Sequence, residues 1–185
     1  MNEVVKALRC HRFSGLDGSG KPAAKAGALR DVLSIDEMPM PQAGNGEILI
    51  QTHYAGVQYP DALQAQGLYQ MRPSLPYVPG MDVAGTVLGV GPDVDGFARG
   101  DRVLAEVGIG GLSEVVVAEA KRVWNAPDSL DLAKCANVGR NYFAAYHTLK
   151  VIGEIGEGDL VVVNGASGGV GMAAIQLAKA MGALV

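Results

Sequence analysis

One segment of the sequence has residue types and spacing that could hold a dinucleotide. Residues 160–163 are a continuous apolar, β-branched run, which is typical of a parallel strand covered on both faces. A glycine-rich turn follows, and a helical pattern continues to residue 182. Glycines let the backbone approach a pyrophosphate closely, and the first turn of a helix offers free N–H groups. The segment predicts a dinucleotide-binding turn, with a tight strand–helix turn of another α/β protein as the alternative. The turn residues are Gly165, Ala166, Ser167, Gly168, Gly169, Val170 and Gly171.

The choice between NAD and NADP depends on a residue that follows this turn. An acidic side chain about 20 positions past the start of the motif binds the ribose hydroxyl, or a basic neighbourhood accepts a 2′-phosphate. Counted from Gly165, that position falls near Val185, the last residue. We therefore expect the chain to be the truncated N-terminal part of a longer enzyme, and to be inactive alone.

Composition limits the broad class of protein. Hydrophobic residues make up 49% of the chain, which is enough for a sizeable core. The net charge of -4 argues against a nucleic-acid-binding surface. Cys10 and Cys135 lie far apart and form no CxxC pair, and no long apolar run indicates a signal peptide or a membrane span. These features predict a cytoplasmic protein with neither nucleic acid nor membrane as a partner.

Turn signals divide the first two thirds of the chain into short strands. Many short strands separated by Gly and Pro favour a partly open β-barrel. From residue 131 the apolar spacing becomes helical and leads into the glycine turn. The sequence predicts a β domain over residues 1–126 and the start of an α/β domain over 127–185. The expected strands are 4–10, 47–54, 82–90, 102–105 and 113–117.

Together with the glycine turn, residues 55–69, 75–85 and 96–103 resemble the medium-chain dehydrogenase/reductase superfamily. Within it, the chain is most similar to the zinc-independent quinone oxidoreductase (zeta-crystallin-like) branch. The resemblance implies a chaperonin-10-like (GroES-like), partly open β-barrel that carries the catalytic and substrate functions, followed by a Rossmann domain. It also implies a homodimer as the assembly of the full-length parent.

Metal chemistry separates the branches of this superfamily. The zinc alcohol dehydrogenases carry a Cys in the segment that matches Gln58–Asp61, and a His-Glu pair where this chain has Met81 and Asp82. A zinc site needs three converging protein ligands. The sequence therefore predicts no metal site. Without a Lewis acid, the favoured reaction is hydride addition to an already polarised acceptor, such as a quinone or an α,β-unsaturated carbonyl.

The resemblance assigns roles to single side chains in the β domain. Tyr69 matches the proposed proton donor of the related 2-enoyl thioester reductases, and a phenol can donate to the α-carbon; the alternative is a packed ring with a wet hydroxyl. Gln58 stands where the branch more often has Asn beside the nicotinamide, so a catalytic and cofactor contact is expected. Asp61 follows Pro60 and is expected to cap a helix or to make a functional hydrogen bond.

Asn141 lies in a segment that resembles the helix reaching the cofactor, with Ala144 in place of the usual Thr. Contact with phosphate or the nicotinamide amide is one interpretation, and an interdomain polar contact is the other. Overall, the resemblance implies an NADPH-dependent reductase of a small electrophilic acceptor, with NADH left open. Reduction of 2-enoyl thioesters is one alternative. A non-catalytic structural or binding relative is another alternative. It is favoured by Gln58, Leu63 and Ala144, which differ from the residues common at these positions in the branch.

Overall fold

The computed structural model describes residues 4–185. Contacts between Cα atoms divide the chain into two compact units, the first ending at Ala136 and the second spanning Asn137–Val185. The domain boundary expected at residues 126/127 stays a prediction.

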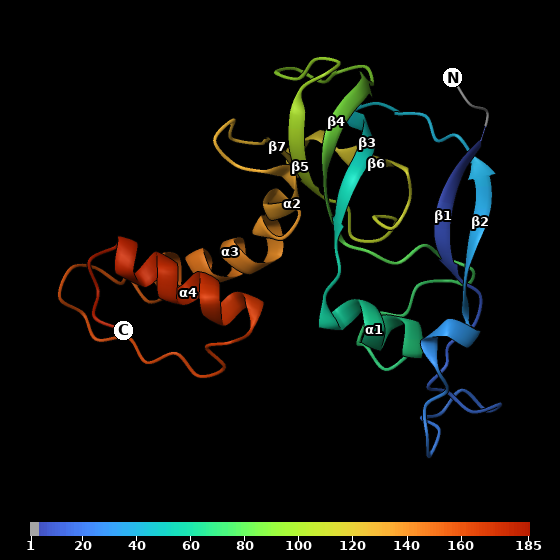
Figure 1. Cartoon of the computed structure of the whole chain (residues 1–185), viewed down its shortest axis with the longest axis horizontal. Coiled ribbons are helices and arrows are strands. Elements are labelled where there is room, and N and C mark those ends of the chain that lie inside the picture. The colour runs from blue at the N-terminus through green and yellow to red at the C-terminus, as the bar shows by residue number, and fades with distance from the viewer. Residues whose placement is uncertain (1–3) are drawn as a thin grey trace. The chain divides into compact units, whose positions relative to one another are not determined.

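The first unit contains two antiparallel sheets (Figure 1). The smaller sheet pairs β1 with β2, and the larger one has the strand order β6-β3-β4-β5-β7. Ala7 of the small sheet bridges to Ser113, and the N–H of Glu114 donates to the Lys6 carbonyl, so β1 also contacts the segment before β6. The predicted partly open β-barrel is confirmed. The strands are β1 (Val4–Cys10), β2 (Leu33–Pro39), β3 (Glu47–Gly56), β4 (Asp82–Val90), β5 (Arg102–Glu106), β6 (Val115–Glu119) and β7 (Val123–Asn125).

The core of the larger sheet comes from alternating positions on its strands. Ile48 and Ile50 of β3 are fully buried, and Val83 and Val87 of β4 and Val103 of β5 are at most 1% exposed. Removing one such side chain from water stabilises the fold by about 1.5–3 kcal/mol. Strands β2 and β7 were not predicted; β7 has only three residues, too few to show an alternating pattern.

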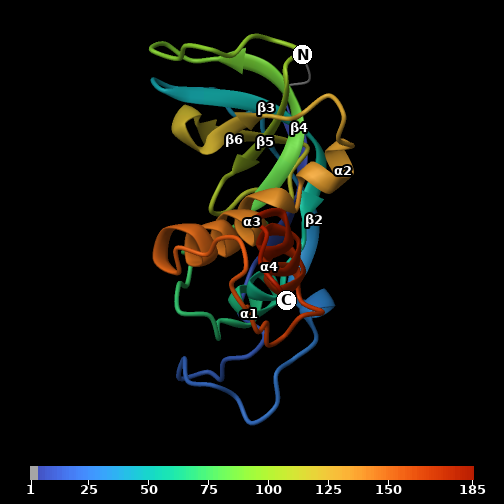
Figure 2. The ribbon, with the colours of Figure 1, turned by 90° about the vertical axis from the view of Figure 1, so that its left-hand side faces the viewer.

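Helix α1 (Tyr59–Gln66) follows directly from β3 and ends at Gly67, whose φ of 75° closes the helix in the left-handed region. Its Ala65 packs on Cys10 of β1 and on Tyr77. The short helix α2 (Leu132–Cys135) covers Ala84 and Leu104 of the sheet. Figure 2, turned by 90° from the view of Figure 1, shows α1 below strands β3 to β6 of the larger sheet.

The second unit consists of α3 (Val138–Tyr146), a π-helical segment (His147–Ile152) and α4 (Gly169–Ala180). Helices α3 and α4 pack against each other along their lengths. The strand expected over residues 160–163 is wrong as a full strand. Within the described chain it forms one parallel bridge, Leu160 to Leu184, with the Val161 N–H donating to the Leu184 carbonyl. A parallel ladder needs neighbouring strands, and this segment finds only one partner residue, so Val162 stays 80% exposed.

Candidate active site and cofactor turn

A cluster of hydrogen-bonded polar residues in the first unit lies where β3 passes into α1. The backbone N–H of Gln58 donates to Oδ2 of Asp61 at 2.7 Å, and the side-chain Nε2 of Gln58 donates to Oδ2 of Asp82 at 2.6 Å. Asp61 is 5% exposed and Asp82 is 2% exposed, whereas Gln58 is half-buried. One residue therefore supplies hydrogen-bond donors to two buried carboxylates.

The fold brings Asp82 to this point through sheet register. Asp82 is the first residue of β4 and pairs with Gly56 on β3 and with Glu106 on β5. It is therefore flanked by strands on both sides. Because Gln58 follows β3 by only two residues, its side chain spans the short distance from the start of α1 back to the start of β4.

The prediction that Asp61 is the N-cap of the helix is wrong. Gln58 is the N-cap, with extended backbone angles (φ −126°, ψ 163°), and Asp61 is the third residue of the helix. Helix α1 starts earlier than expected because Pro60 fits within its first turn, where no intrahelical N–H bond is required. Asp61 still serves the helix start, because its carboxylate accepts the Gln58 N–H in a capping box.

Tyr69 lies at the opposite end of α1 from Gln58. It follows the closing Gly67 and is partly exposed, and its hydroxyl makes no hydrogen bond with any residue from 4 to 185. An eight-residue helix is about 12 Å long, so Gln58 and Tyr69 flank α1 rather than share one point. The structure thus brings Gln58 and Asp61 together and keeps Tyr69 apart from them.

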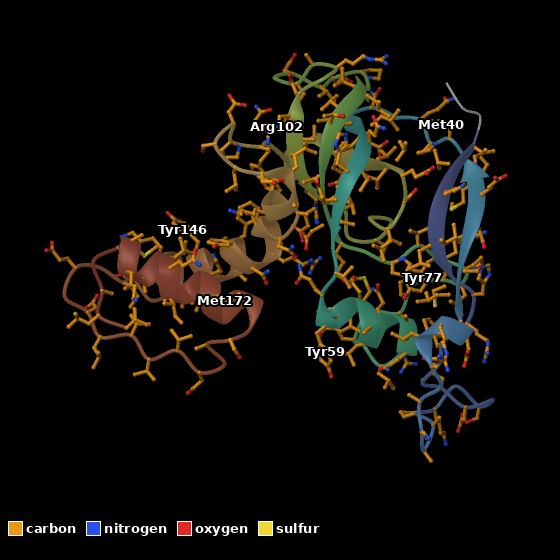
Figure 3. All side chains as sticks on the ribbon, in the orientation of Figure 1. Met40, Tyr59, Tyr77, Arg102, Tyr146 and Met172 are labelled. Atoms are coloured by element: carbon orange, nitrogen blue, oxygen red, sulfur yellow. The ribbon has the colours of Figure 1, made fainter. Side chains whose placement is uncertain are left out.

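Tyr77 contacts α1 from the side of β1, as Figure 3 shows, and sequence reasoning missed it. Burial raises the pKa of its phenol, and the Cys10 thiol and the Asp61 carboxyl raise it further. Gln64, also missed, is completely buried on α1, and neither its amide oxygen nor its nitrogen has a hydrogen-bond partner among residues 4–185. A Pro-flanked Tyr and a Gln within a helical pattern carry no signal that separates these residues from ordinary surface positions.

The glycine turn of the second unit leads into α4 as predicted. The Gly168 N–H donates to the Gly165 carbonyl at 3.0 Å, and Gly165 has a φ of 72° that favours glycine. Gly168 is the N-cap of α4, and residues 164–170 are exposed. The first N–H groups of a twelve-residue helix are therefore accessible, in the arrangement that suits a phosphate group.

The glycines of this turn have different neighbours. A Cβ on Gly171 would collide with the Gly165 carbonyl oxygen, and a Cβ on Gly169 would lie 2.6 Å from Oδ1 of Asn141. A Cβ on Gly168 would meet only the Gly165 carbonyl, at 3.4 Å. A Cβ on Gly165 would meet nothing within 4 Å, so Gly165 and Gly168 both leave open space at the turn, which fits a closely approaching pyrophosphate. The structure also brings Asn141 to the predicted turn, through the packing of α3 on α4.

No group of three or more His, Cys, Asp or Glu side chains in the described part of the chain could hold a metal ion. Among residues 4–185, no helix is both long and apolar enough to cross a membrane.

Comparison with known proteins matches residues 44–128 to the alcohol dehydrogenase GroES-like domain. Human quinone oxidoreductase is 40% identical over 181 residues, which cover 97% of this chain and 51% of that protein. The quinone oxidoreductase of pig is equally similar over the same share of both chains. The chain thus spans about half the length of the curated relatives it matches.

Solved structures agree with this comparison. The quinone oxidoreductase from Thermus thermophilus, crystallised also as its complex with NADPH, has a TM-score of 0.76 and 30% identity, covering 96% of this chain and 51% of its own. The human synaptic vesicle membrane protein VAT-1 homolog-like protein has a TM-score of 0.86 and 29% identity, over 97% of this chain and 54% of its own.

Proposed function

Because the chain belongs to the medium-chain dehydrogenase/reductase superfamily, we propose that it forms part of an NADPH-dependent reductase that works without zinc. The acceptor would be a quinone or an α,β-unsaturated carbonyl. The observation that carries the proposal is the exposed glycine turn at the start of α4, where Gly168 leaves space for a pyrophosphate. The quinone oxidoreductases among the relatives support the acceptor class.

The residues of the turn would bind and orient the cofactor. The N–H groups at the start of α4 would donate hydrogen bonds to the pyrophosphate oxygens, and the positive end of the helix dipole would stabilise their negative charge. When bound, reduced nicotinamide supplies a hydride, which carries two electrons to the acceptor. Tyr69 or a water molecule would supply the proton that completes the reduction, giving a hydroquinone or a saturated carbonyl.

The donor set around Gln58 supports the absence of zinc from the reaction. The positions that match zinc ligands in the alcohol dehydrogenases hold an amide, a thioether and a carboxylate, from Gln58, Met81 and Asp82. Only the carboxylate is a usual ligand for this ion. The Gln58 amide already donates a hydrogen bond to the Asp82 carboxylate. This intramolecular bond occupies a carboxylate oxygen that a metal ion would need.

Ligand-dependent thermal unfolding tests the cofactor part of the proposal. We expect NADPH to raise the midpoint, because a ligand at about 100 times its Kd stabilises a protein by about 2.7 kcal/mol. The measurement is made on the 185-residue chain and on any longer product of its gene, with NADH in parallel. A shift with NADH alone would contradict the choice of NADPH, and no shift with either would contradict the reductase.

Gly168→Ala provides the matched variant for this experiment. Its φ of −79° is allowed for alanine, but alanine is a poorer N-cap than glycine, so the protein without cofactor should lose about 1 kcal/mol of unfolding free energy at most. The added methyl group occupies the space open to a pyrophosphate, so the NADPH-induced shift should shrink. Gly156→Ala, where a Cβ meets nothing within 4 Å, should leave both values unchanged. An unchanged shift in Gly168→Ala would remove this turn from the binding site.

A non-catalytic binding protein is the second candidate. Its support is the Gln58 amide, which bonds to Asp82 instead of being left open to a ligand. Steady-state oxidation of NADPH with a panel of quinones, enones and 2-enoyl thioesters separates the candidates. Turnover with any of these acceptors supports the reductase and names its substrate class, whereas cofactor binding without turnover supports the non-catalytic relative.

A further inference from the structure

Asn141 of α3 lies against the first residue of α4. A Cβ built on Gly169 would lie 2.6 Å from Oδ1, 2.7 Å from Nδ2 and 2.8 Å from Cγ of Asn141. All three atoms of the amide group are equally close, so the flat face of this group covers the Gly169 Cα. With the Asn141 side chain in this position, only a hydrogen atom fits between the two residues.

The Asn141 side chain is held in this place from its own helix. Its Nδ2 donates to the Asn137 carbonyl at 3.1 Å, one turn earlier along the chain. The next residue fastens α3 to α4 a second time, because the Tyr142 hydroxyl donates to Oε1 of Gln176 at 2.6 Å. Gln176 lies about two turns beyond Gly169 on α4. The two helices therefore contact each other at two positions along α4. Asn141 makes the contact next to the glycine turn.

We propose that Asn141 is a positioning residue for the cofactor turn, which acts through Gly169 and does not itself touch the cofactor. The inference rests on the proposed function, and it replaces the direct contact expected from the sequence. Asn141 covers the side of Gly169 that faces α3. It therefore fixes the position of the first N–H groups of α4. Gly169 is then required by a contact within the protein, whereas Gly168 is required by the ligand.

This assignment differs from the usual explanation of a glycine in such a turn, which is close approach of the cofactor to the backbone. The two explanations predict different behaviour when both residues are changed. If the Asn141 amide is the obstacle, its removal makes room for a methyl group on residue 169. If the cofactor is the obstacle, the methyl group blocks binding whatever residue 141 is.

A four-protein cycle tests the proposal: the wild type, Asn141→Ala, Gly169→Ala and the double variant. The dissociation constant for NADPH is measured by titration of the folded proteins, and the stability without cofactor by urea unfolding. We expect Gly169→Ala to weaken NADPH binding about tenfold, because the methyl group moves the first N–H groups of α4 away from the pyrophosphate. Asn141→Ala should weaken it by a smaller factor, and the double variant should bind more tightly than Gly169→Ala. Gly156→Ala, in open space, is the matched glycine control.

Each outcome decides the assignment. A double variant that binds no better than Gly169→Ala would overturn it in favour of the cofactor as the obstacle. An Asn141→Ala variant that loses stability but keeps the wild-type dissociation constant would make Asn141 a purely structural residue, and would also overturn it. If the wild type binds no NADPH, the proposed function fails together with this role. The urea cycle then still shows whether Asn141 and Gly169 are coupled, because it needs no cofactor.

Discussion

The side-chain amide of Gln58 and the carboxylate of Asp82 are joined by a hydrogen bond of 2.6 Å. The bond links the N-cap of α1 to the first residue of β4, two elements that are separated by the long loop after the helix. Asp82 is 2% exposed, so this donor compensates part of the cost of burying a carboxylate. The same residue also satisfies Asp61 through its backbone N–H.

Gln58→Ala should therefore destabilise the first unit. The change removes a donor from a buried carboxylate, which typically costs about 1–3 kcal/mol. The free energy of unfolding, measured by urea titration, reports this loss. Gln70→Ala removes the same kind of side chain from an exposed position and should change it by less than about 0.5 kcal/mol.

A double-mutant cycle with Asp82→Ala checks that the loss comes from this bond. Residues in direct contact couple by about 0.5–3 kcal/mol, so the double variant should lose less than the sum of the single variants. Additive losses would show that Gln58 stabilises the unit by some other contact.

Most of the β architecture could be predicted from the sequence because turn chemistry and alternation are local signals. The predicted strand at residues 82–90 coincides with β4, and β3 and β5 differ from expectation only at their ends. The segment at residues 160–163 shows the limit of such signals. Its apolar run fits a parallel strand, yet strand formation depends on neighbours, and among residues 4–185 only Leu184 pairs with it.

The candidate site was predictable only in part. Motif spacing was enough to predict the glycine turn, whereas Gln58 and Asn141 were predicted only through the resemblance to the medium-chain dehydrogenase/reductase superfamily. The partners of these residues depend on tertiary register. Asp82 meets Gln58 because β3 and β4 pair as they do, and Asn141 meets Gly169 because α3 packs on α4. Neither contact has a signature in the local sequence.

Arg102→Ala should loosen the segment between β7 and α2. Nη2 of Arg102 donates to the Leu130 carbonyl at 2.7 Å, and Nη1 lies 3.5 Å from the Asp128 carbonyl oxygen. Losing these charge-assisted bonds should cost about 1.5–3 kcal/mol of unfolding free energy. Arg102→Lys should lose most of the same free energy, because one ammonium group cannot make the two hydrogen bonds that the planar guanidinium group makes.

Asp128→Asn is the control for the ion pair at the same place. The Asp128 side chain is fully exposed, and its Oδ1 lies 3.5 Å from Nη1 of Arg102, so the pair contributes little. We expect no measurable change in urea unfolding. A loss as large as that of Arg102→Ala would mean that the ion pair, and not the carbonyl bonds, holds the segment.

Gly171→Ala should distort the cofactor turn even without cofactor. A Cβ at this position would collide with the Gly165 carbonyl oxygen and lie 2.9 Å from the Ala166 Cα, and backbone atoms cannot move aside as side chains can. Overpacking of this kind typically costs about 1–3 kcal/mol. Thermal unfolding of the protein without ligand, compared with Gly168→Ala, measures the effect. Equal midpoints for the two variants would show that the turn adapts to either methyl group.

The region between α1 and β1 should make the protein sensitive to alkaline pH. Burial raises the pKa values of the Tyr77 phenol and the Cys10 thiol above those of the unfolded chain. The unfolded chain then releases these protons first as the pH rises, so it binds fewer protons than the folded protein. The stability that both groups contribute is complete below about pH 8.5 and is lost progressively above it.

Tyr77→Phe should flatten this loss of stability above about pH 10, where the unfolded phenol ionises. At neutral pH the change should cost less than about 1 kcal/mol, because the hydroxyl makes no well-formed hydrogen bond among residues 4–185. Urea unfolding at several pH values from neutral to alkaline measures both effects. Tyr59→Phe is the control, because Tyr59 at the start of α1 is 75% exposed and its replacement should keep the wild-type profile. A Tyr77→Phe profile as steep as that of the wild type would mean that other groups cause the alkaline loss, with Cys10 the next to replace.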